Sequence, residues 1–388
     1  MHNMRNISLF YSSKEGGNTG KGGAYFSLLA YKNELIKEYD VKIIHDNELK
    51  TTVLDGYEDI KLLKSQTLLV KVKVLAKYFK KNRPLAFFSF SGRILTIYIR
   101  FFCFLYGTKY IYIKAGGPNG QIRQYFQNTI FYNEENLKNS EKKRNLNSFL
   151  LSNRVESPIQ NRIRVENFFI KHETKTISLK ILRVSRINNI YYETFLATIK
   201  QHLELQKKNI SVLTHLIGYI EDQDVFNKLQ GDIIGIDNLF LFTEEYYTIN
   251  TKELIPFYDV VVGIGRGFWE GVVNDKIVLG YCKNSSLPVL VNHQNIMDFR
   301  KNNFSTRTIV ESPITFVESY ENFQNEYFKN GYKGLLKKVF DDEYSSLTLL
   351  KKLNTIINSS SKENFFKIVK SYLPFKYKYL PKLKFLFK

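Results

Sequence analysis

The sequence is poor in cysteine and tryptophan. Its 388 residues include 2 cysteines and 1 tryptophan. Cys103 and Cys282 both lie in apolar sequence without metal-ligand spacing, which excludes a disulfide framework and a zinc ribbon and favours a reducing compartment. Hydrophobic residues make up 44% of the chain and aromatic residues 15%. This composition excludes a chain that is disordered throughout.

Acidic residues are missing from two long stretches. Residues 60–133 contain 13 Lys or Arg and no Asp or Glu, and residues 364–388 contain 7 Lys and no acid. The formal net charge of the whole chain is +20. AT-rich coding explains abundant Lys and Asn, but it does not explain the missing acids. An acid-free, aromatic-rich surface suits a polyanion, either anionic lipid headgroups or nucleic acid.

The sequence also lacks a convincing membrane-spanning run. Residues 94–113 are mostly apolar, but they contain Arg100, Gly107 and Lys109. A central Arg is costly in hydrocarbon, and Gly107 has the character of a helix stop. We therefore expect a buried helix followed by a buried strand, and no membrane span. The first apolar run, residues 7–11, is too short for a signal peptide.

Short apolar runs alternate with helical patterns along the whole chain. The expected strands are 6–11, 41–44, 85–90, 109–114, 177–184, 210–217, 239–242, 259–262, 277–281 and 287–291. Glycine-rich turns repeatedly follow these strands. The pattern predicts two doubly wound α/β domains with ligands at the carboxyl ends of their strands. We expect domains at 1–165 and 166–345, followed by C-terminal helices and a basic aromatic tail at 346–388.

A glycine-rich loop at 12–23 follows the first expected strand. It is not a P-loop, because Glu15 stands where that motif needs Gly and Gly22 stands where it needs Ser or Thr. Gly22 and Gly23 at the start of a helix could bind phosphate or sugar hydroxyls, or they could form an ordinary turn. The loop alone leaves both interpretations open.

A second glycine-rich turn, residues 263–267, follows the apolar strand 260–262. It places Arg266 in the first turn of a helix, where the helix dipole disfavours a cation unless an anion is bound. Glu270, one turn later, could accept hydrogen bonds from the hydroxyls of a sugar. The alternative is a plain helix start with a solvent-facing Glu. Three glycines in one turn favour ligand binding.

Other motifs carry weaker signals. Arg186 follows the expected strand 177–184 and suits a diphosphate, although an Arg in a loop is more often simply solvated. Asp222 and Asp224 have the spacing of a divalent-metal motif, but acids also commonly open helices. The six His residues show no metal-ligand spacing.

The second half of the chain resembles the donor domain of bacterial GT-B glycosyltransferases, in particular the retaining family-4-like enzymes of capsule, O-antigen and teichoic-type glycan assembly. The resemblance rests on residues 182–186, 258–266 and 269–273. Those enzymes typically carry Gly-Arg-x-x-x-Glu-Ala before an apolar strand. Residues 22–24 resemble their first acceptor-domain loop, and 151–155 resemble the segment that precedes their donor domain.

This resemblance implies a GT-B architecture of two Rossmann-like domains facing a cleft, with the nucleotide-sugar donor on the second. Glu270 and Arg186 would be catalytic, binding the donor sugar and its diphosphate. Donor-binding residues would be Gly263, Gly265, Arg266, Gly267, Gly218 and Tyr258. Acceptor-side loops would contribute Gly22, Gly23, Gly116, Gly117 and Asn119. Neither a metal nor another cofactor is expected.

The expected function is transfer of a sugar to a lipid-linked oligosaccharide in synthesis of a bacterial surface polysaccharide, such as capsule or lipopolysaccharide. The enzyme would lie in the cytoplasm, peripheral on the inner face of the cell membrane, in contact with anionic lipid and not with nucleic acid. Departures from the family pattern support an alternative. Val262 stands where a first Glu is usual, and residues 190–192 lack the usual Lys. The alternative is a catalytically silent relative that acts as a glycan-binding or partner subunit. A nucleic-acid-binding protein is a third hypothesis, supported by charge alone.

Overall fold

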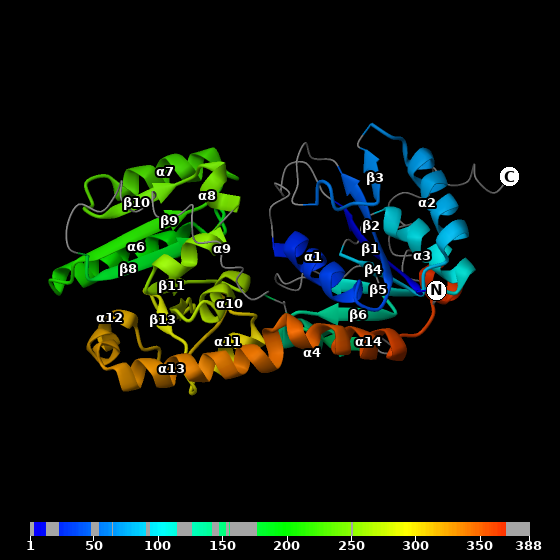
Figure 1. The fold of residues 1–388 in the computed structure, drawn as a ribbon. Coiled ribbons are helices and arrows are strands. Elements are labelled where there is room, and N and C mark those ends of the chain that lie inside the picture. Colours follow the sequence, from blue (N-terminus) through cyan, green and yellow to red (C-terminus); the bar gives the residue numbers. More distant parts are fainter. Residues whose placement is uncertain are drawn as a thin grey trace. The chain divides into compact units, whose positions relative to one another are not determined.

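The computed structural model describes residues 4–12, 23–47, 54–63, 65–90, 94–114, 126–141, 147–152, 155, 177–249 and 251–369. The chain forms two compact units (Figure 1). Unit 1 comprises residues 1–152 and 348–388, and unit 2 comprises 153–347. The C-terminal segment, which we expected to stand apart, groups with unit 1.

Unit 1 is built on a sheet of seven parallel strands in the order β3-β2-β1-β4-β5-β6-β7. The strands are β1 (Asn6–Ser12), β2 (Asp40–Asn47), β3 (Ile60–Leu63), β4 (Ala86–Ser89), β5 (Lys109–Lys114), β6 (Asn128–Phe131) and β7 (Asn147–Leu150). β4 and β6 are buried along their whole length. Helices on both faces of a parallel sheet exclude water, so such strands read as continuous apolar runs.

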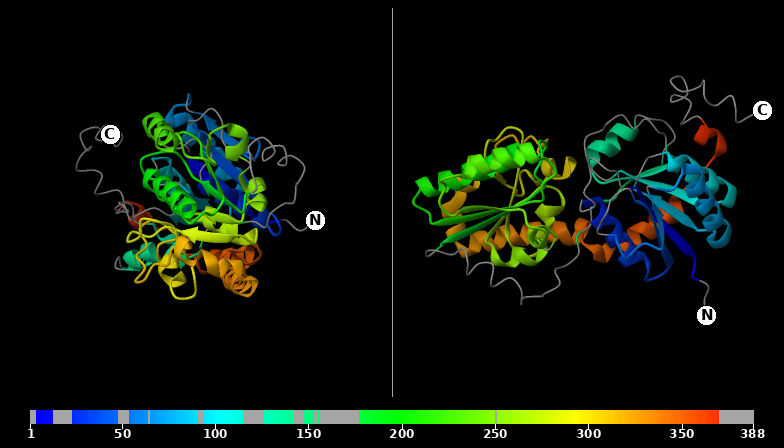
Figure 2. Two further views of the ribbon diagram at one scale, coloured as in Figure 1. Left: turned by 90° about the vertical axis from the view of Figure 1, so that its left-hand side faces the viewer. Right: turned by 90° about the horizontal axis from the view of Figure 1, so that it is seen from above.

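Alternate residues of β1 pack into two separate hydrophobic cores, one on each face of the sheet. Leu9 belongs to the core that contains residues of α1 (Gly23–Leu35) and α14 (Leu349–Ser359). Phe10 belongs to the core under α2 (Leu68–Asn82) and α3 (Leu95–Tyr106). Each face of the sheet is therefore covered by its own helices (Figure 2). α4 (Glu134–Glu141) packs against β6 and β7.

The apolar stretch 94–113 forms a helix and a strand, as predicted. α3 ends at Gly107, which has a φ of 66°, and β5 follows directly. Gly107 supplies the left-handed C-cap that other residues adopt with difficulty. In the ranges that the structure describes, no helix combines the length and the apolar character needed to cross a bilayer.

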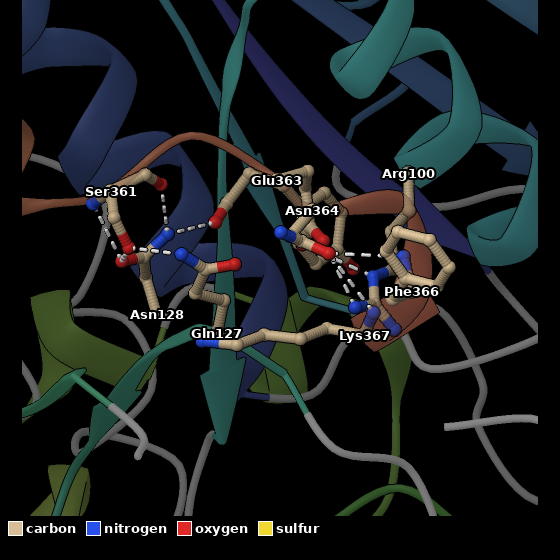
Figure 3. Close-up of polar contacts among 9 residues, drawn as sticks. Arg100, Gln127, Asn128, Ser361, Glu363, Asn364, Phe366 and Lys367 are labelled. Atoms are coloured by element: carbon tan, nitrogen blue, oxygen red, sulfur yellow. Dashed lines mark hydrogen bonds and ion pairs between the residues drawn. The ribbon is translucent and has the colours of Figure 1, made fainter. Parts of the chain in front are cut away.

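The C-terminal segment is part of the unit 1 core. Leu349 and Leu353 of α14 are fully buried in the core that contains α1. Beyond α14, Asn128 donates to the carbonyl oxygen of Ser361 at 2.8 Å and its Oδ1 accepts from the Ser361 backbone N–H at 3.0 Å (Figure 3). This packing explains why residue 348 onward belongs with unit 1.

A buried ion pair fixes the same segment. Arg100 of α3 donates from Nε and Nη2 to the two carboxylate oxygens of Glu363, at 3.1 and 3.0 Å (Figure 3). Both side chains have no exposed surface. Burial raises the pKa of the Glu363 carboxyl, and the Arg100 guanidinium opposes that rise. The Arg that argued against a membrane span thus has a buried carboxylate partner 263 residues further along the chain.

Unit 2 is built on a six-stranded sheet in the order β10-β9-β8-β11-β12-β13. Its strands are β8 (Leu179–Val184), β9 (Val212–Ile217), β10 (Leu239–Phe242), β11 (Val260–Val262), β12 (Ile277–Gly280) and β13 (Val289–Leu290). β13 is antiparallel to β12, and the other pairs are parallel. The two sheets confirm the prediction of two Rossmann-like, doubly wound α/β domains with C-terminal helices.

The helices of unit 2 follow its strands. They are α6 (Tyr192–Lys207), α7 (Gln223–Ile233), α8 (Glu245–Ile249), α9 (Thr251–Leu254), α10 (Arg266–Val273), α11 (Ile296–Lys301), α12 (Phe316–Ser319) and α13 (Glu326–Val339). Trp269 of α10 is fully buried and its ring stacks on Tyr344 at a centroid distance of 3.9 Å. This stacking fixes α10, the helix that follows the second glycine-rich turn.

Candidate functional site

The order of the strands in unit 2 locates the candidate site. β8 has β9 on one side and β11 on the other, so the strand order reverses between β8 and β11. Ligands of doubly wound sheets bind at this reversal, outside the carboxyl ends of the strands. Arg186 follows β8, and the turn of residues 263–267 follows β11. Arg186 and the second glycine-rich turn therefore lie at the same edge, after neighbouring strands.

Two of the three glycines in the turn after β11 are required by its backbone geometry. A Cβ on Gly263 would lie 2.4 Å from the backbone nitrogen of Phe268. Gly265 is the N-cap of α10, with φ 53° and ψ −113°, a backbone conformation that favours Gly. At Gly267 a Cβ would meet no atom within 4 Å. We interpreted all three as glycines that admit a ligand. Gly263 also allows the close approach of the first turn of α10, which begins at Arg266, and ligand binding by the three glycines stays a prediction.

Arg266 and Glu270 form an ion pair along α10. The Nε atom of Arg266 donates to Oε1 of Glu270 at 2.7 Å, and the side chains are 16% and 20% exposed. The carboxylate thus compensates the cation at the start of the helix. We expected a bound anion to compensate the charge of Arg266. Glu270, on the same helix, supplies a negative charge beside it. Among the described residues, no partner is recorded for Oε2 of Glu270, so that oxygen can accept a further hydrogen bond.

Arg186 lies in a polar cluster formed by the loops after β8 and β9. Its Nη1 donates to Oε1 of Glu221 at 3.0 Å, and its Nη2 donates to the Tyr191 hydroxyl at 3.2 Å. Glu221 also accepts from the Tyr219 hydroxyl at 3.0 Å and from the side-chain amide of Asn188. Burial lowers the pKa of the Arg186 guanidinium, but the Tyr191 and Glu221 oxygens raise it by more. The guanidinium is held in place and still about one third exposed.

The sequence reasoning missed Glu221, which positions Arg186. It follows an isolated bridge between Ile187 and Ile220 that joins the two loops. Gly218, predicted to bind the donor, is needed for the same approach, because a Cβ there would lie 2.0 Å from the carbonyl oxygen of Ser185. Neither role has a local sequence signal, since both depend on the pairing of β8 with β9.

Arg183 is a second residue that the sequence reasoning missed. It is 1% exposed, and its guanidinium donates to the carbonyl oxygens of Val184 at 3.2 Å and Val262 at 3.3 Å. It also donates to Oγ1 of Thr194 at 2.9 Å. Its cation lies 5.0 Å from the centre of the Tyr281 ring. Among the described residues, no carboxylate is recorded as its partner.

The position of Arg183 matters for the chemistry of this edge. Val184 and Val262 are the last residues of β8 and β11. The guanidinium therefore links the ends of the two strands at the reversal and places a buried positive charge there. Burial lowers its pKa. A buried cation without a carboxylate partner favours an anion nearby, because its charge is otherwise uncompensated in a medium of low polarity.

Tyr258 and Asp222, two other residues singled out from the sequence, have structural roles. Tyr258 lies before β11, at the amino end of the strand, and donates or accepts a 2.7 Å hydrogen bond with Nδ1 of His215 in the core. The structure therefore does not bring it together with Arg186 and Glu270. Asp222 is the N-cap of α7 and accepts from the backbone N–H groups of Asp224 and Val225. This is the helix-opening role that we weighed against a metal site.

The acceptor-side loops are described only in part. Gly23 is the first residue of α1, and a Cβ there would meet no atom within 4 Å. Gly22, Gly116, Gly117 and Asn119 lie outside the described residues. Unit 1 has its own reversal of strand order between β1 and β4, where a Rossmann-like sheet binds ligands.

No protein-family model matches the sequence, and no curated protein matches it either. Solved structures are similar in fold over nearly the whole chain. A glycosyltransferase from Rickettsia africae matches with a TM-score of 0.66 at 12% identity, over 92% of this chain and 98% of that one. Anabaena Alr3699/HepE in complex with UDP and glucose matches with a TM-score of 0.61 at 11% identity, over 92% of this chain and 100% of that one.

A third similar structure is the sucrose-phosphate synthase of Thermosynechococcus elongatus, with a TM-score of 0.57 at 8% identity, over 91% of this chain and 98% of that one. These proteins are glycosyltransferases of the GT-B type. The fold predicted from the resemblance is therefore confirmed. At these identities the likeness establishes the fold alone.

Proposed function

We propose that this protein is a glycosyltransferase that binds a nucleotide-sugar donor at the carboxyl edge of the unit 2 sheet. One observation carries the proposal. Arg186 and the Arg266–Glu270 pair follow β8 and β11, the two strands at the reversal of strand order. A guanidinium suits a diphosphate, and a carboxylate accepts hydrogen bonds from sugar hydroxyls. Since the Anabaena structure holds UDP and glucose, a UDP-sugar is the first donor to test.

Each group has a role in the proposed reaction. The acceptor oxygen forms a bond to the anomeric carbon of the sugar as the bond from that carbon to the diphosphate breaks. Negative charge then grows on the departing diphosphate. Arg186, with Arg183 behind it, would stabilise that charge, and Glu270 would orient the sugar. Because cationic side chains meet the diphosphate, we propose that no divalent metal is required. Retention of the anomeric configuration is proposed from the family resemblance.

We further propose that unit 1 binds the acceptor, a lipid-linked oligosaccharide of bacterial surface polysaccharide synthesis, at the inner face of the cell membrane. The acid-free sequence of residues 60–133 supports a location beside anionic lipid. The alternation of lysine with aromatic residues and leucine in the tail, residues 372–384, predicts that it lies at the same interface. The tail falls outside the described residues.

Nucleotide binding tests the donor site. We would measure the melting temperature and calorimetric binding with UDP, GDP, ADP and CMP, each with and without EDTA. At a hundredfold excess over the dissociation constant, a ligand stabilises the folded state by about 2.7 kcal/mol. Arg186→Ala should abolish the shift. Lys207→Ala should retain it, because Lys207 lies in the last turn of α6, where its exposed side chain pairs with Glu204. The absence of a shift with every nucleotide would refute the donor site.

A catalytically silent relative is the second candidate. It is favoured by the ion pairs that engage both catalytic candidates, Glu270 with Arg266 and Arg186 with Glu221. The two functions differ in turnover. The enzyme releases sugar from a labelled UDP-sugar, slowly to water and faster to acceptor, and it loses this activity in Glu270→Gln. A silent relative binds the nucleotide without either reaction.

A further inference from the structure

Unit 1 exposes a group of large apolar side chains on α3 and on the segment after α14. Phe104 of α3 lies against Phe365, with ring centres 5.8 Å apart, and Phe365 lies 6.1 Å from Phe366. Phe366 is 80% exposed. We call this group the aromatic patch, and it consists of Phe101, Phe104, Leu105, Phe365, Phe366 and Val369. Exposed apolar side chains that adjoin one another mark a surface for a partner or a membrane.

The aromatic patch is a fixed part of unit 1. The Arg100 side chain of α3 forms the buried ion pair with Glu363 (Figure 3). Phe101 and Phe104 of the same helix remain exposed. Lys109 of β5 donates to the carbonyl oxygen of Ile357 at 2.7 Å and so ties the end of α14 to the sheet. The patch therefore has two supports that are both anchored in the core, and it is not a frayed helix end.

Exposed lysine side chains lie on α2, the helix beside α3, and in the segment after α14. α2 packs beside α3, with the Phe79 ring 5.5 Å from that of Phe102 and 6.1 Å from that of Tyr106. α2 contains no acidic residue, and neither does α3. Glu363, the acid nearest to the patch in the sequence, is buried against Arg100. The exposed lysines on α2 and beside the patch are Lys73, Lys77, Lys80, Lys81, Lys362 and Lys367.

We propose that the aromatic patch and these lysines bind the surface of an anionic lipid bilayer. Aromatic and aliphatic side chains enter the boundary between headgroups and acyl chains, and lysines contact the anionic headgroups. The inference deepens the proposed function and rests on it for the cellular role, because it assigns the face of unit 1 that holds the enzyme at its lipid-linked acceptor. The sequence that continues after Val369 adds further lysine and aromatic residues without an acid.

Charge favours lipid over two other occupants. In a symmetric dimer built on this face, the lysines of α2 would meet their own copies and repel. The phosphates of a nucleic acid would pair with the lysines. A nucleic acid would not bury exposed aliphatic residues such as Leu105 and Val369 in an apolar environment. An anionic bilayer satisfies both the charge and the apolar surface.

Vesicle flotation of the full-length protein tests the proposal. We expect binding to phosphatidylcholine vesicles that contain about a third phosphatidylglycerol, weakening with salt, and little binding to phosphatidylcholine alone. Phe104→Ser combined with Phe366→Ser should weaken binding more than tenfold. Ile234→Ser is the matched control and should bind as the wild type does, because Ile234 is also 80% exposed but lies in unit 2.

A second pair of variants tests the lysines. Lys80→Gln with Lys81→Gln removes two exposed charges of α2, and we expect a weakening of about 25-fold, since each lysine near an anionic surface contributes about fivefold. Lys337→Gln with Lys338→Gln removes an equally adjacent exposed pair from α13 of unit 2 and should leave binding unchanged. Thermal melts establish that all variants fold.

Several results would overturn the proposal. The first two are a wild type that does not bind anionic vesicles and patch variants that bind them as the wild type does. The others are a dimer in sedimentation that the Phe variants dissociate, and binding to duplex DNA that is tighter than binding to vesicles. Nucleotide binding is measured on the same samples. A wild type that binds nucleotide but not anionic vesicles refutes only the lipid surface, and a wild type that binds the vesicles but no nucleotide refutes only the donor site.

Discussion

Arg266 and Glu270 form an ion pair across one turn of α10, with 2.7 Å between Nε and Oε1. The pair places a carboxylate at the carboxyl edge of the unit 2 sheet and fixes its direction. It also explains how a cation is tolerated at the start of the helix that follows β11.

Glu270→Gln tests the role of that carboxylate. The amide keeps the shape of the side chain but loses the charge that holds Arg266 and that strengthens hydrogen bonds to sugar hydroxyls. We expect transfer to fall at least a hundredfold, while binding of UDP alone changes less than threefold. Radiolabelled sugar transfer and calorimetry measure the two effects.

Glu204→Gln is the matched control, because Glu204 is paired with Lys207 on α6 in an i,i+3 ion pair that is largely solvated. It should leave transfer unchanged. A Glu270→Gln protein with wild-type transfer would remove the carboxylate from the mechanism.

Arg183→Met tests the buried cation behind the site. Methionine fills similar space without charge, so the cost of burying a guanidinium disappears together with its hydrogen bonds to Val184, Val262 and Thr194. These effects oppose each other, and we expect the free energy of unfolding to change by less than about 2 kcal/mol. The affinity for UDP should fall about tenfold, a loss near 1.4 kcal/mol, whereas the affinity for uridine should not change.

Equal weakening of UDP and uridine would show that Arg183 only supports the fold of the strand ends. Calorimetry with UDP and with uridine, on the wild type and on Arg183→Met, distinguishes the two outcomes.

The ion pair between Arg100 and Glu363 makes a prediction about stability. Arg100→Met leaves a buried carboxylate without its partner, which costs about 3–5 kcal/mol of unfolding free energy. Adding Glu363→Leu should recover most of that loss, because two apolar residues replace the whole pair. Urea unfolding at pH 7 measures both variants. Lys138→Met, which breaks the exposed pair of Lys138 with Glu134, should cost less than about 0.5 kcal/mol.

His202 makes the stability of unit 2 depend on pH. Burial lowers the pKa of its imidazole to about 4, and the neutral ring bonds to Oγ1 of Thr214 at 2.9 Å and the carbonyl oxygen of Asp237 at 3.0 Å. In the unfolded chain a His titrates near 6.5, so the unfolded state takes up the proton first as the pH falls. The contribution is present above pH 6.5 and is lost towards pH 4. We expect a loss of about 2 kcal/mol between pH 7 and pH 5.

His202→Gln should remove that part of the pH dependence, as measured by urea unfolding at both pH values. His293→Gln is the control, because His293 is exposed and the variant should keep the wild-type dependence. Identical dependence in both variants would exclude His202 as its source.

The sequence was sufficient to predict the fold and to place Arg186 and Glu270 after strands of the second sheet. Buried strands such as β5 and β11 are continuous apolar runs, and Arg186 and Glu270 both follow such runs. The strands β3, β6 and β7 were not recognised, because polar residues interrupt their apolar runs, whereas equally short strands such as β10 and β11 are apolar throughout. The hydrogen-bond and ion-pair partners of the candidate site residues could not be predicted from the sequence either. Glu221 meets Arg186 across two loops, and Arg183 is buried only once β8 lies between β9 and β11. Such contacts depend on the packing of distant segments, which no local motif encodes.

The return of the chain to unit 1 sets an order of events during synthesis. Residues 153–347 form an uninterrupted unit that can close as soon as they leave the ribosome. Unit 1 starts earlier in the chain, but its core includes Leu349, Leu353 and Ile357. Arg100 also has no ion-pair partner until Glu363 has been synthesised. The unit whose translation starts first is therefore the last to be completed. Until residues 348 onward are made, the sheet face that α14 covers is exposed and can bind chaperones.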